Sequence, residues 1–101
     1  VFSGCENLNE ITIPYGVINI GDGAFEECKS LREVSIPDSV ASIGDYAFWN
    51  CQSLNQITVW SNVTSIGYSA FDGCKNLTIR AFKGSYAERY ALENEIPFEE
   101  I

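Results

Sequence analysis

Four cysteines recur at a constant interval of 23 residues, and their thiols are the first candidates for chemistry in this chain. They are Cys5, Cys28, Cys51 and Cys74. Three interpretations are open: two disulfides, a four-cysteine zinc site, or reduced cysteines in a core. Zinc sites in small domains use close pairs such as C-x2-C, which bring four sulfurs to one point. The wide, even spacing therefore disfavours a metal site.

The same spacing disfavours disulfides. If each cysteine occupies one turn of a coil, neighbouring cysteines stack about 4.8 Å apart in a column. Side chains that stack in parallel do not point at each other as a disulfide bond requires. We therefore predict reduced cysteines in the core, where free Cys acts as a small apolar residue. A count of fewer than four free thiols in the denatured chain would contradict this prediction.

The composition argues against catalysis and against several classes of partner. The 101 residues are 46% hydrophobic and 20% charged, which suits one small domain, and they include no histidine. Histidine is the commonest general base and the usual partner of Ser or Cys nucleophiles, so we expect no enzyme and no cofactor. The net charge of -8 disfavours nucleic acid and anionic membranes. No apolar run is long enough for a transmembrane helix, so we expect no membrane insertion.

The cysteines mark a repeat, because aligning on them places apolar residues in fixed columns. These columns are Leu8, Leu31, Leu54 and Leu77; Ile11, Val34 and Ile57; Ile13, Ile36 and Val59; Val17, Val40 and Val63; Ile20, Ile43 and Ile66; and Phe2, Phe25, Phe48 and Phe71. A fixed period of this length is typical of a solenoid, in which each turn buries its apolar side against its neighbours. Each column is therefore expected to run through one continuous core.

Each repeat contains three kinds of local structure. The pattern Leu-x-x-Ile-x-Ile predicts a short strand with its alternating apolar residues inward, and stacked strands make a parallel sheet. Pro14 and Pro37 end the strands, because proline has no N–H to donate. A second extended piece, Val-x-x-Ile-Gly, follows. The remainder, such as "GDYAFWNC", is too short for a long helix and predicts one helical or 3₁₀ turn.

The combined pattern Ile-Gly-x-x-Ala-Phe-x-x-Cys-x-x-Leu-x-x-Ile-x-Ile-Pro resembles the BspA-like, or treponemal-type, leucine-rich repeat, over about residues 1–82. The resemblance implies an α/β right-handed solenoid of about 3.5 rungs, with a parallel sheet on its concave side. It also implies a secreted or surface-anchored bacterial protein, often one that adheres to proteins of a host or a neighbouring cell. The family has no shared catalytic residues.

The fourth rung departs from the pattern. After Leu77 the apolar residues come one position early, at Ile79 and Ala81, which indicates a single deletion. This deletion leaves Thr78 and Arg80 facing outward. The repeat array is therefore expected to end here.

Residues 83–101 are expected to form a C-terminal cap. Ser85 and Glu88 have the spacing of a capping box, and an apolar stripe predicts a helix from Tyr86 to about Glu93. Such a helix covers the last rung, whose apolar side would otherwise meet water.

The first rung lacks its Val-x-x-Ile-Gly piece, because the chain starts at Val1 and Phe2. This start indicates a fragment of a longer array with an uncapped strand edge. Since an open edge invites pairing with another chain, we expect a homodimer through the first rung.

The outward residues of the main sheet are the leading candidates for a binding site, because the inward columns form the core. In leucine-rich repeats the exposed face of this sheet often binds partners, so the resemblance supports this choice. The polar, mildly acidic strip consists of Glu10, Thr12, Glu33, Ser35, Gln56, Thr58 and Arg80. The alternative is a solvated β-surface in which Thr serves its strand propensity.

Two tryptophans extend the candidate surface. Trp60 stands where earlier rungs have proline, and Trp49 stands in a column of acidic residues, so both are expected to face solvent. Exposed Trp is a typical interface anchor. Alternatively, Trp60 lies over neighbouring rungs or packs on an adjacent domain.

These observations predict a non-catalytic protein-binding or adhesion module at the extracellular side or surface of a bacterial cell. It would bind through the exposed strand residues and neighbouring aromatics. One alternative is a structural spacer or presenting scaffold without a ligand of its own. Another is a carbohydrate-binding module, in which tryptophans stack on sugar faces.

Overall fold

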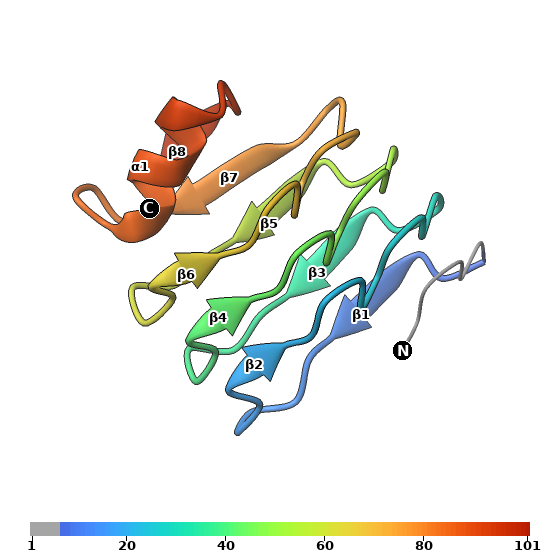
Figure 1. The fold of residues 1–101 in the computed structure, drawn as a ribbon, viewed down its shortest axis with the longest axis horizontal. Helices are drawn as coiled ribbons and strands as arrows, with labels where there is room; N and C mark the ends of the chain where they lie inside the picture. The colour runs from blue at the N-terminus through green and yellow to red at the C-terminus, as the bar shows by residue number, and fades with distance from the viewer. Residues whose placement is uncertain (1–6) are drawn as a thin grey trace.

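The computed structural model describes residues 7–101 and shows a chain that winds into stacked turns, the first three of which contribute one strand to each of two sheets (Figure 1). In chain order the elements are β1 (Glu10–Thr12), β2 (Asn19–Ile20), β3 (Glu33–Ser35), β4 (Ser42–Ile43), β5 (Gln56–Thr58), β6 (Ser65–Ile66), β7 (Thr78–Ala81), α1 (Tyr86–Glu93) and β8 (Phe98–Glu100). The first sheet has the order β1-β3-β5-β7-β8 and the second has the order β2-β4-β6. The first sheet therefore contains four repeat strands and the second contains three, in agreement with the expected solenoid of about 3.5 rungs.

The strand register follows the repeat. Ile11 pairs with Val34 and Val34 pairs with Ile57, in parallel strands one period apart. Ile57 then pairs with Ile79, one residue short of the period. The deletion predicted in the fourth rung is therefore confirmed, and it keeps the apolar residues of β7 inward.

The predicted apolar columns form one continuous core between the two sheets. Phe48 is fully buried and stacks on Phe25 and Phe71, with ring centroids 5.3 and 5.4 Å apart. Fully buried residues also include Leu31, Leu54, Val40, Val59 and Ile79. Cys5 and Phe2, which belong to the same columns, lie outside the described residues. The described columns confirm the solenoid core expected from the period.

The segment that follows a strand of the second sheet is not the helical or 3₁₀ turn expected from the sequence. We call it the turn segment. After β2 it consists of successive tight turns, in which the N–H groups of Ala24, Glu26 and Cys28 each donate to the carbonyl three residues earlier, at 3.2 Å. The intervening N–H groups of Phe25 and Glu27 instead donate to the next turn of the coil, both at 2.7 Å. A 3₁₀ run would use every N–H internally. The segment thus joins neighbouring turns as a strand does.

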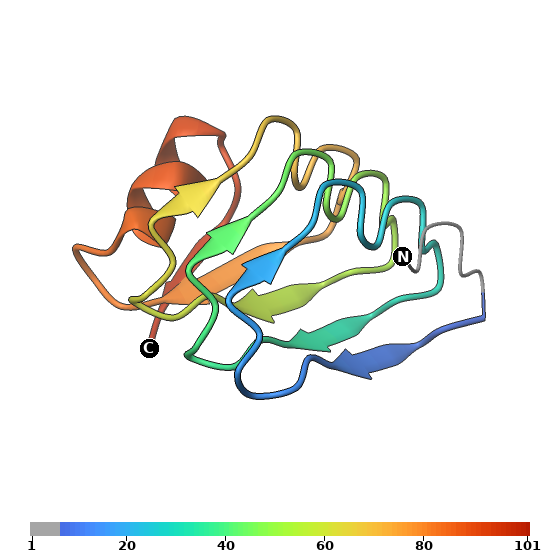
Figure 2. The ribbon, with the colours of Figure 1, turned by 60° about the horizontal axis from the view of Figure 1, so that its bottom comes forward.

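The C-terminal helix has the predicted limits, Tyr86–Glu93. The Glu88 N–H donates to the Ser85 hydroxyl at 3.2 Å, while the Glu88 carboxylate accepts from the Gly84 N–H at 2.6 Å. The capping box therefore closes one residue earlier than its usual form, in which the carboxylate accepts from the cap residue itself. Ala87 and Ala91 are the buried residues of this helix. The helix covers the end of the coil, as Figure 2 shows.

The cap also contains a strand that the sequence did not predict. After α1 the chain turns back, and β8 pairs in parallel with β7, with Phe98 opposite Ile79. The Ile79 N–H donates to the Pro97 carbonyl at 2.9 Å. The sequence Phe-Glu-Glu has little strand propensity of its own. It becomes a strand because the helix brings it beside β7.

Candidate functional site

The described cysteines make hydrogen bonds between turns. The Cys51 thiol lies 3.1 Å from the Phe25 carbonyl oxygen, and the Cys74 thiol lies 3.1 Å from that of Phe48. Cys28, Cys51 and Cys74 are free thiols, as predicted. Within residues 7–101, no group of three or more potential ligands is placed to hold a metal ion. The described part of the cysteine column is therefore structural, and the Cys51 and Cys74 thiols donate across turns as well as filling space.

Ionisable groups in and beside this column make the free energy of unfolding depend on pH in the alkaline range. Hydrogen bonding with Cys74 and burial raise the pKa of the Cys51 thiol above its ordinary value, and the same hydrogen bond lowers the pKa of Cys74. Burial, assisted by the Asp72 charge, raises the pKa of Tyr90 to about 12. The shifts of Cys51 and Tyr90 favour the neutral folded group, so their stabilisation is complete below the pKa of the unfolded group and falls as pH rises above it. The Cys74 shift acts in the opposite direction and offsets part of this loss.

We therefore expect the free energy of unfolding to fall as pH rises above about 8.5, where unfolded thiols ionise, by up to about 1.4 kcal/mol per pH unit for each such group. Urea unfolding followed by circular dichroism at several pH values measures this loss. The Cys51→Ala variant should lose less stability between neutral pH and the onset of tyrosine ionisation. Equal losses in both proteins would contradict the assignment to Cys51.

The polar strip is assembled on the outer face of the first sheet. Glu10 pairs with Glu33, and Glu33 pairs with Gln56, so these three exposed side chains form one row. Thr12 pairs with Ser35 beside them, and both are exposed. The structure therefore brings these predicted site residues together.

Arg80 ends the second row of the strip. It pairs with Thr58 on one side and with Glu99 of the unpredicted β8 on the other. The Arg80 Nε lies 2.9 Å from a Glu99 carboxylate oxygen, and both side chains are partly exposed. Arg80 is therefore already neutralised within the chain, which leaves the free charges of the strip acidic.

Trp60 does not face solvent, so that expectation was wrong. Its ring is half-buried, and its indole Nε1–H donates to the Ile36 carbonyl of the preceding turn at 2.6 Å. The ring also lies against Phe82, with centroids 6.2 Å apart. The alternative interpretation, in which Trp60 lies over neighbouring rungs, is the one the structure supports.

Trp49 is also half-buried. It lies in the turn segment that leads from β4 in the second sheet back to β5 in the first, and Figure 2 shows the course of that segment. It forms an edge-to-face pair with Tyr46, at 6.3 Å, and Tyr46 forms another with Tyr68, at 5.8 Å. Tyr68 is 73% exposed, more than either tryptophan. These three rings form the aromatic ridge, and its two tyrosines belong to the neighbouring aromatics through which binding is expected.

Tyr46 is held in an unusual backbone conformation. Its φ is 58°, in a column where the preceding turn has Gly23 at φ 64°. A bulky residue in this region is disfavoured, and such strain is concentrated at functional sites. The available sequence signal was that Tyr46 stands in a column that holds Gly23 and Ser69 in the neighbouring turns.

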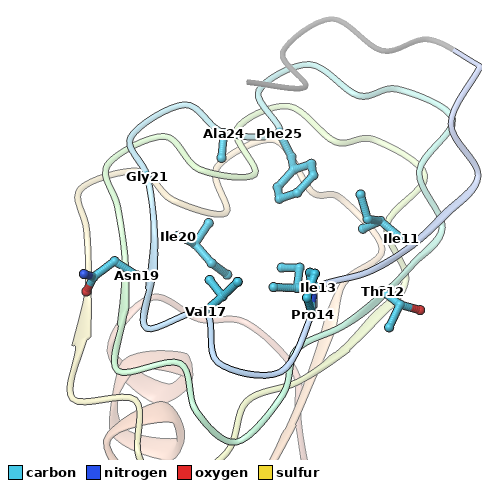
Figure 3. A pocket seen from close by; sticks show the side chains of 10 residues that line it. All are labelled: Ile11, Thr12, Ile13, Pro14, Val17, Asn19, Ile20, Gly21, Ala24 and Phe25. Atoms are coloured by element: carbon cyan, nitrogen blue, oxygen red, sulfur yellow. The ribbon is translucent and has the colours of Figure 1, made fainter.

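A hollow of about 490 Å³ lies at the end of the coil beside β1 (Figure 3). Apolar side chains line it, among them Ile11, Val17, Ile20 and Phe25. A contact between two copies would use this end of the coil, and the homodimer expected from the sequence stays a prediction. That expectation also concerns Val1 and Phe2, which lie outside the described residues.

The helix of the described chain is too short and too polar to cross a membrane, and no other helix is found between residues 7 and 101.

The repeats match known proteins. A family model described as a BspA type leucine rich repeat region, in six copies, matches residues 1–100. A leucine rich cell surface protein from Faecalibacterium prausnitzii A2-165 is 45% identical, with a TM-score of 0.73 over 76% of this chain and 20% of that chain. A leucine-rich repeat protein from Bacteroides ovatus ATCC 8483 is 27% identical, with a TM-score of 0.66 over 100% of this chain and 32% of that one. The chain thus spans a third or less of these structures, and no curated protein matches it significantly.

Proposed function

Because this chain belongs to the family of BspA-type leucine-rich repeat proteins, we propose that it is a non-catalytic module that binds a protein partner at a bacterial cell surface. The cell-surface location is supported by the similar protein from Faecalibacterium prausnitzii. The partner is proposed to be a protein on a host cell or on a neighbouring cell.

The observation that carries the proposal is the strip on the first sheet. Glu10, Glu33 and Gln56 are exposed in one row, on strands whose inner faces are locked into the core. A rigid backbone lowers the entropic cost of binding, because little of the surface must be ordered when the partner arrives. The row thus offers a partner a flat, preorganised polar surface.

The chemistry of the strip favours a partner with donors or positive charge. Glu10 and Glu33 are neighbours on adjacent strands. Together with Asn9 and Arg32 they line a hollow of about 350 Å³. Arg80 of the strip is paired with Glu99, and Arg32 at the hollow leaves its two carboxylates in excess of one guanidinium. Acidic surfaces increase the rate at which oppositely charged partners associate, so binding should weaken as salt rises.

The proposal is tested by measuring how the fluorescently labelled chain binds intact epithelial or bacterial cells. We expect the Glu33→Lys variant to bind about tenfold more weakly, a loss of about 1.4 kcal/mol that is typical of a contact residue. Glu27→Lys makes the same charge change at an exposed site in the turn segment, so it serves as the matched control.

Treatment of the cells distinguishes the alternatives. Loss of binding after proteolysis of the cell surface, but not after periodate oxidation of sugars, is the expected result. Binding that survives proteolysis and is lost after oxidation would indicate a carbohydrate ligand instead. No binding by the unmodified chain to any cell, with the fold intact, would favour a structural spacer.

A further inference from the structure

A second surface lies where the helix meets the last repeat. A hollow of about 370 Å³ is formed between the segment after β6 and the end of α1. We call it the C-terminal groove; its polar lining residues are Tyr68, Ser69, Asp72, Tyr90, Glu93 and Asn94. Its volume is within the range of small-molecule sites, and it is lined from two elements that the core holds in place. Tyr68 also belongs to the aromatic ridge, so the groove continues onto that ridge.

The charges in the groove all have one sign. Asp72 and Glu93 contribute carboxylates from opposite walls, and neither Lys nor Arg is among the lining residues. The Asp72 carboxylate accepts from the Ser69 hydroxyl at 2.9 Å, which fixes its position. The raised pKa of Tyr90, to which Asp72 contributes after burial, shows that this negative charge is felt inside the groove.

The end of α1 adds to the negative potential. The carbonyl end of a helix carries partial negative charge, which normally attracts a basic residue in the last turn. Here the last helical residue is Glu93, and the last turn contains no basic residue. The Asn94 amide caps the Tyr90 carbonyl at 2.8 Å, but no basic side chain of the last turn offsets the charge of Glu93.

Aromatic rings complete the site. Tyr68 is 73% exposed, and Tyr90 is held by an edge-to-face contact with Phe71, at 6.1 Å. The aromatic ring face attracts cations, most often the guanidinium of arginine. Carboxylates beside such rings can pair with the N–H groups of the same guanidinium. These features together match a basic side chain more closely than a neutral or acidic one.

We propose that the C-terminal groove binds an arginine or lysine side chain of a protein partner, with Asp72 and Glu93 as charge partners and Tyr68 as the stacking surface. The inference rests on the proposed protein-binding function, and it assigns that function a second contact, across the core from the strip. The probe is an arginine peptide, acetyl-Gly-Ser-Arg-Ser-Gly-amide, and the reference is the same peptide with neutral citrulline in place of arginine.

The experiment is a titration of the isotope-labelled chain followed by amide NMR spectra at low salt. We expect the arginine peptide to shift the amides of Ser69, Glu93 and Asn94, and the citrulline peptide to shift them much less. Asp72→Asn and Glu93→Gln should each weaken binding about threefold, as for partly exposed ion pairs. Tyr68→Ala should have a similar effect through the lost stacking.

Glu27→Gln is the matched control, because it removes one negative charge from an exposed site that belongs to neither the strip nor the groove. An equal loss in Glu27→Gln would mean attraction by net charge alone and would overturn the inference. Equal binding of the citrulline peptide would also overturn it. So would shifts caused in the groove by a neutral oligosaccharide but not by the arginine peptide.

The two proposals can fail separately. Arginine-dependent shifts confined to the strip, around Glu33 and Thr58, would overturn the groove assignment and leave the proposed function standing. Specific filling of the groove by the arginine peptide, with no binding of the chain to cells, would uphold the groove chemistry and contradict the proposed function.

Discussion

Replacing Phe48 with alanine is expected to lower the free energy of unfolding by about 3–5 kcal/mol, the usual cost of removing a fully buried aromatic ring. Phe48 is 0% exposed and stacks almost parallel on Phe25 and Phe71, with interplanar angles of 9° and 2°. Its removal therefore breaks both ring contacts and leaves a cavity in the middle of the column. Small domains have total stabilities of about 5–15 kcal/mol, so this variant should be close to unfolding at room temperature.

Urea unfolding followed by circular dichroism measures this loss, and Phe82→Ala is the control. Phe82 is also a phenylalanine, but it is 42% exposed, and its ring meets Trp60 in a tilted contact with centroids 6.2 Å apart. It should cost less than about 1.5 kcal/mol. Similar losses in the two variants would mean that the phenylalanine column does not form a continuous core.

Gly67→Ala is expected to cost about 3 kcal/mol, although alanine is a small residue. A Cβ atom on Gly67 would collide with backbone atoms of the preceding turn. These are the Asp45 nitrogen and the Gly44 carbonyl carbon, and the Gly44 carbon would lie only 2.6 Å away. Backbone atoms cannot move aside as a flexible side chain can. The Asp45 carboxylate, which accepts from the Tyr68 N–H at 2.7 Å, would also be displaced. The two turns must therefore separate at this point.

The control for Gly67→Ala lies in the same column of the repeat. A Cβ atom on Gly21 would meet no atom within 4 Å, so Gly21→Ala should be neutral or slightly stabilising. Thermal unfolding of both variants measures the difference. A destabilised Gly21→Ala beside an unaffected Gly67→Ala would show that glycine is needed here for its flexibility and not for close contact between turns.

Hydrogen bonds of polar side chains hold neighbouring turns together, in addition to the packing of the apolar core. The Asp22 carboxylate accepts from the Asp45 N–H at 2.9 Å, one turn further along. The Ser39 hydroxyl accepts from the Gly16 N–H and donates to the Val17 carbonyl, at 3.0 and 2.8 Å. Because these bonds join equivalent positions of neighbouring turns, they oppose sliding of one turn over the next. This rigidity is what presents the strip and the groove in a fixed geometry.

Much of the fold could be predicted because the repeat constrains each column several times. Leu31, Leu54 and Leu77 occupy one column, and a solenoid can bury all three only by stacking its turns in register. The helix Tyr86–Glu93 was predictable for a local reason, since its cap and apolar stripe lie within one short segment. The exposed row of Glu10, Glu33 and Gln56 followed directly from the inward columns, because side chains alternate along a strand.

Other features depend on contacts that the pattern does not encode. Trp60 occupies the proline column, and only the position of the Ile36 carbonyl explains why its indole turns inward. The turn segments were expected to be helical, but every second N–H of the segment bonds to the adjacent turn. Local sequence contains no information about a bond whose acceptor lies in another turn.

The sequence by itself therefore determined the period, the core columns, the polar strip and the capping helix, since each depends on the spacing of apolar and polar residues along the chain. Only the tertiary structure decided the strand β8, the Arg80–Glu99 ion pair and the C-terminal groove. These features arise where the helix returns the chain to the last repeat. Their geometry depends on how two separate segments pack against each other in space.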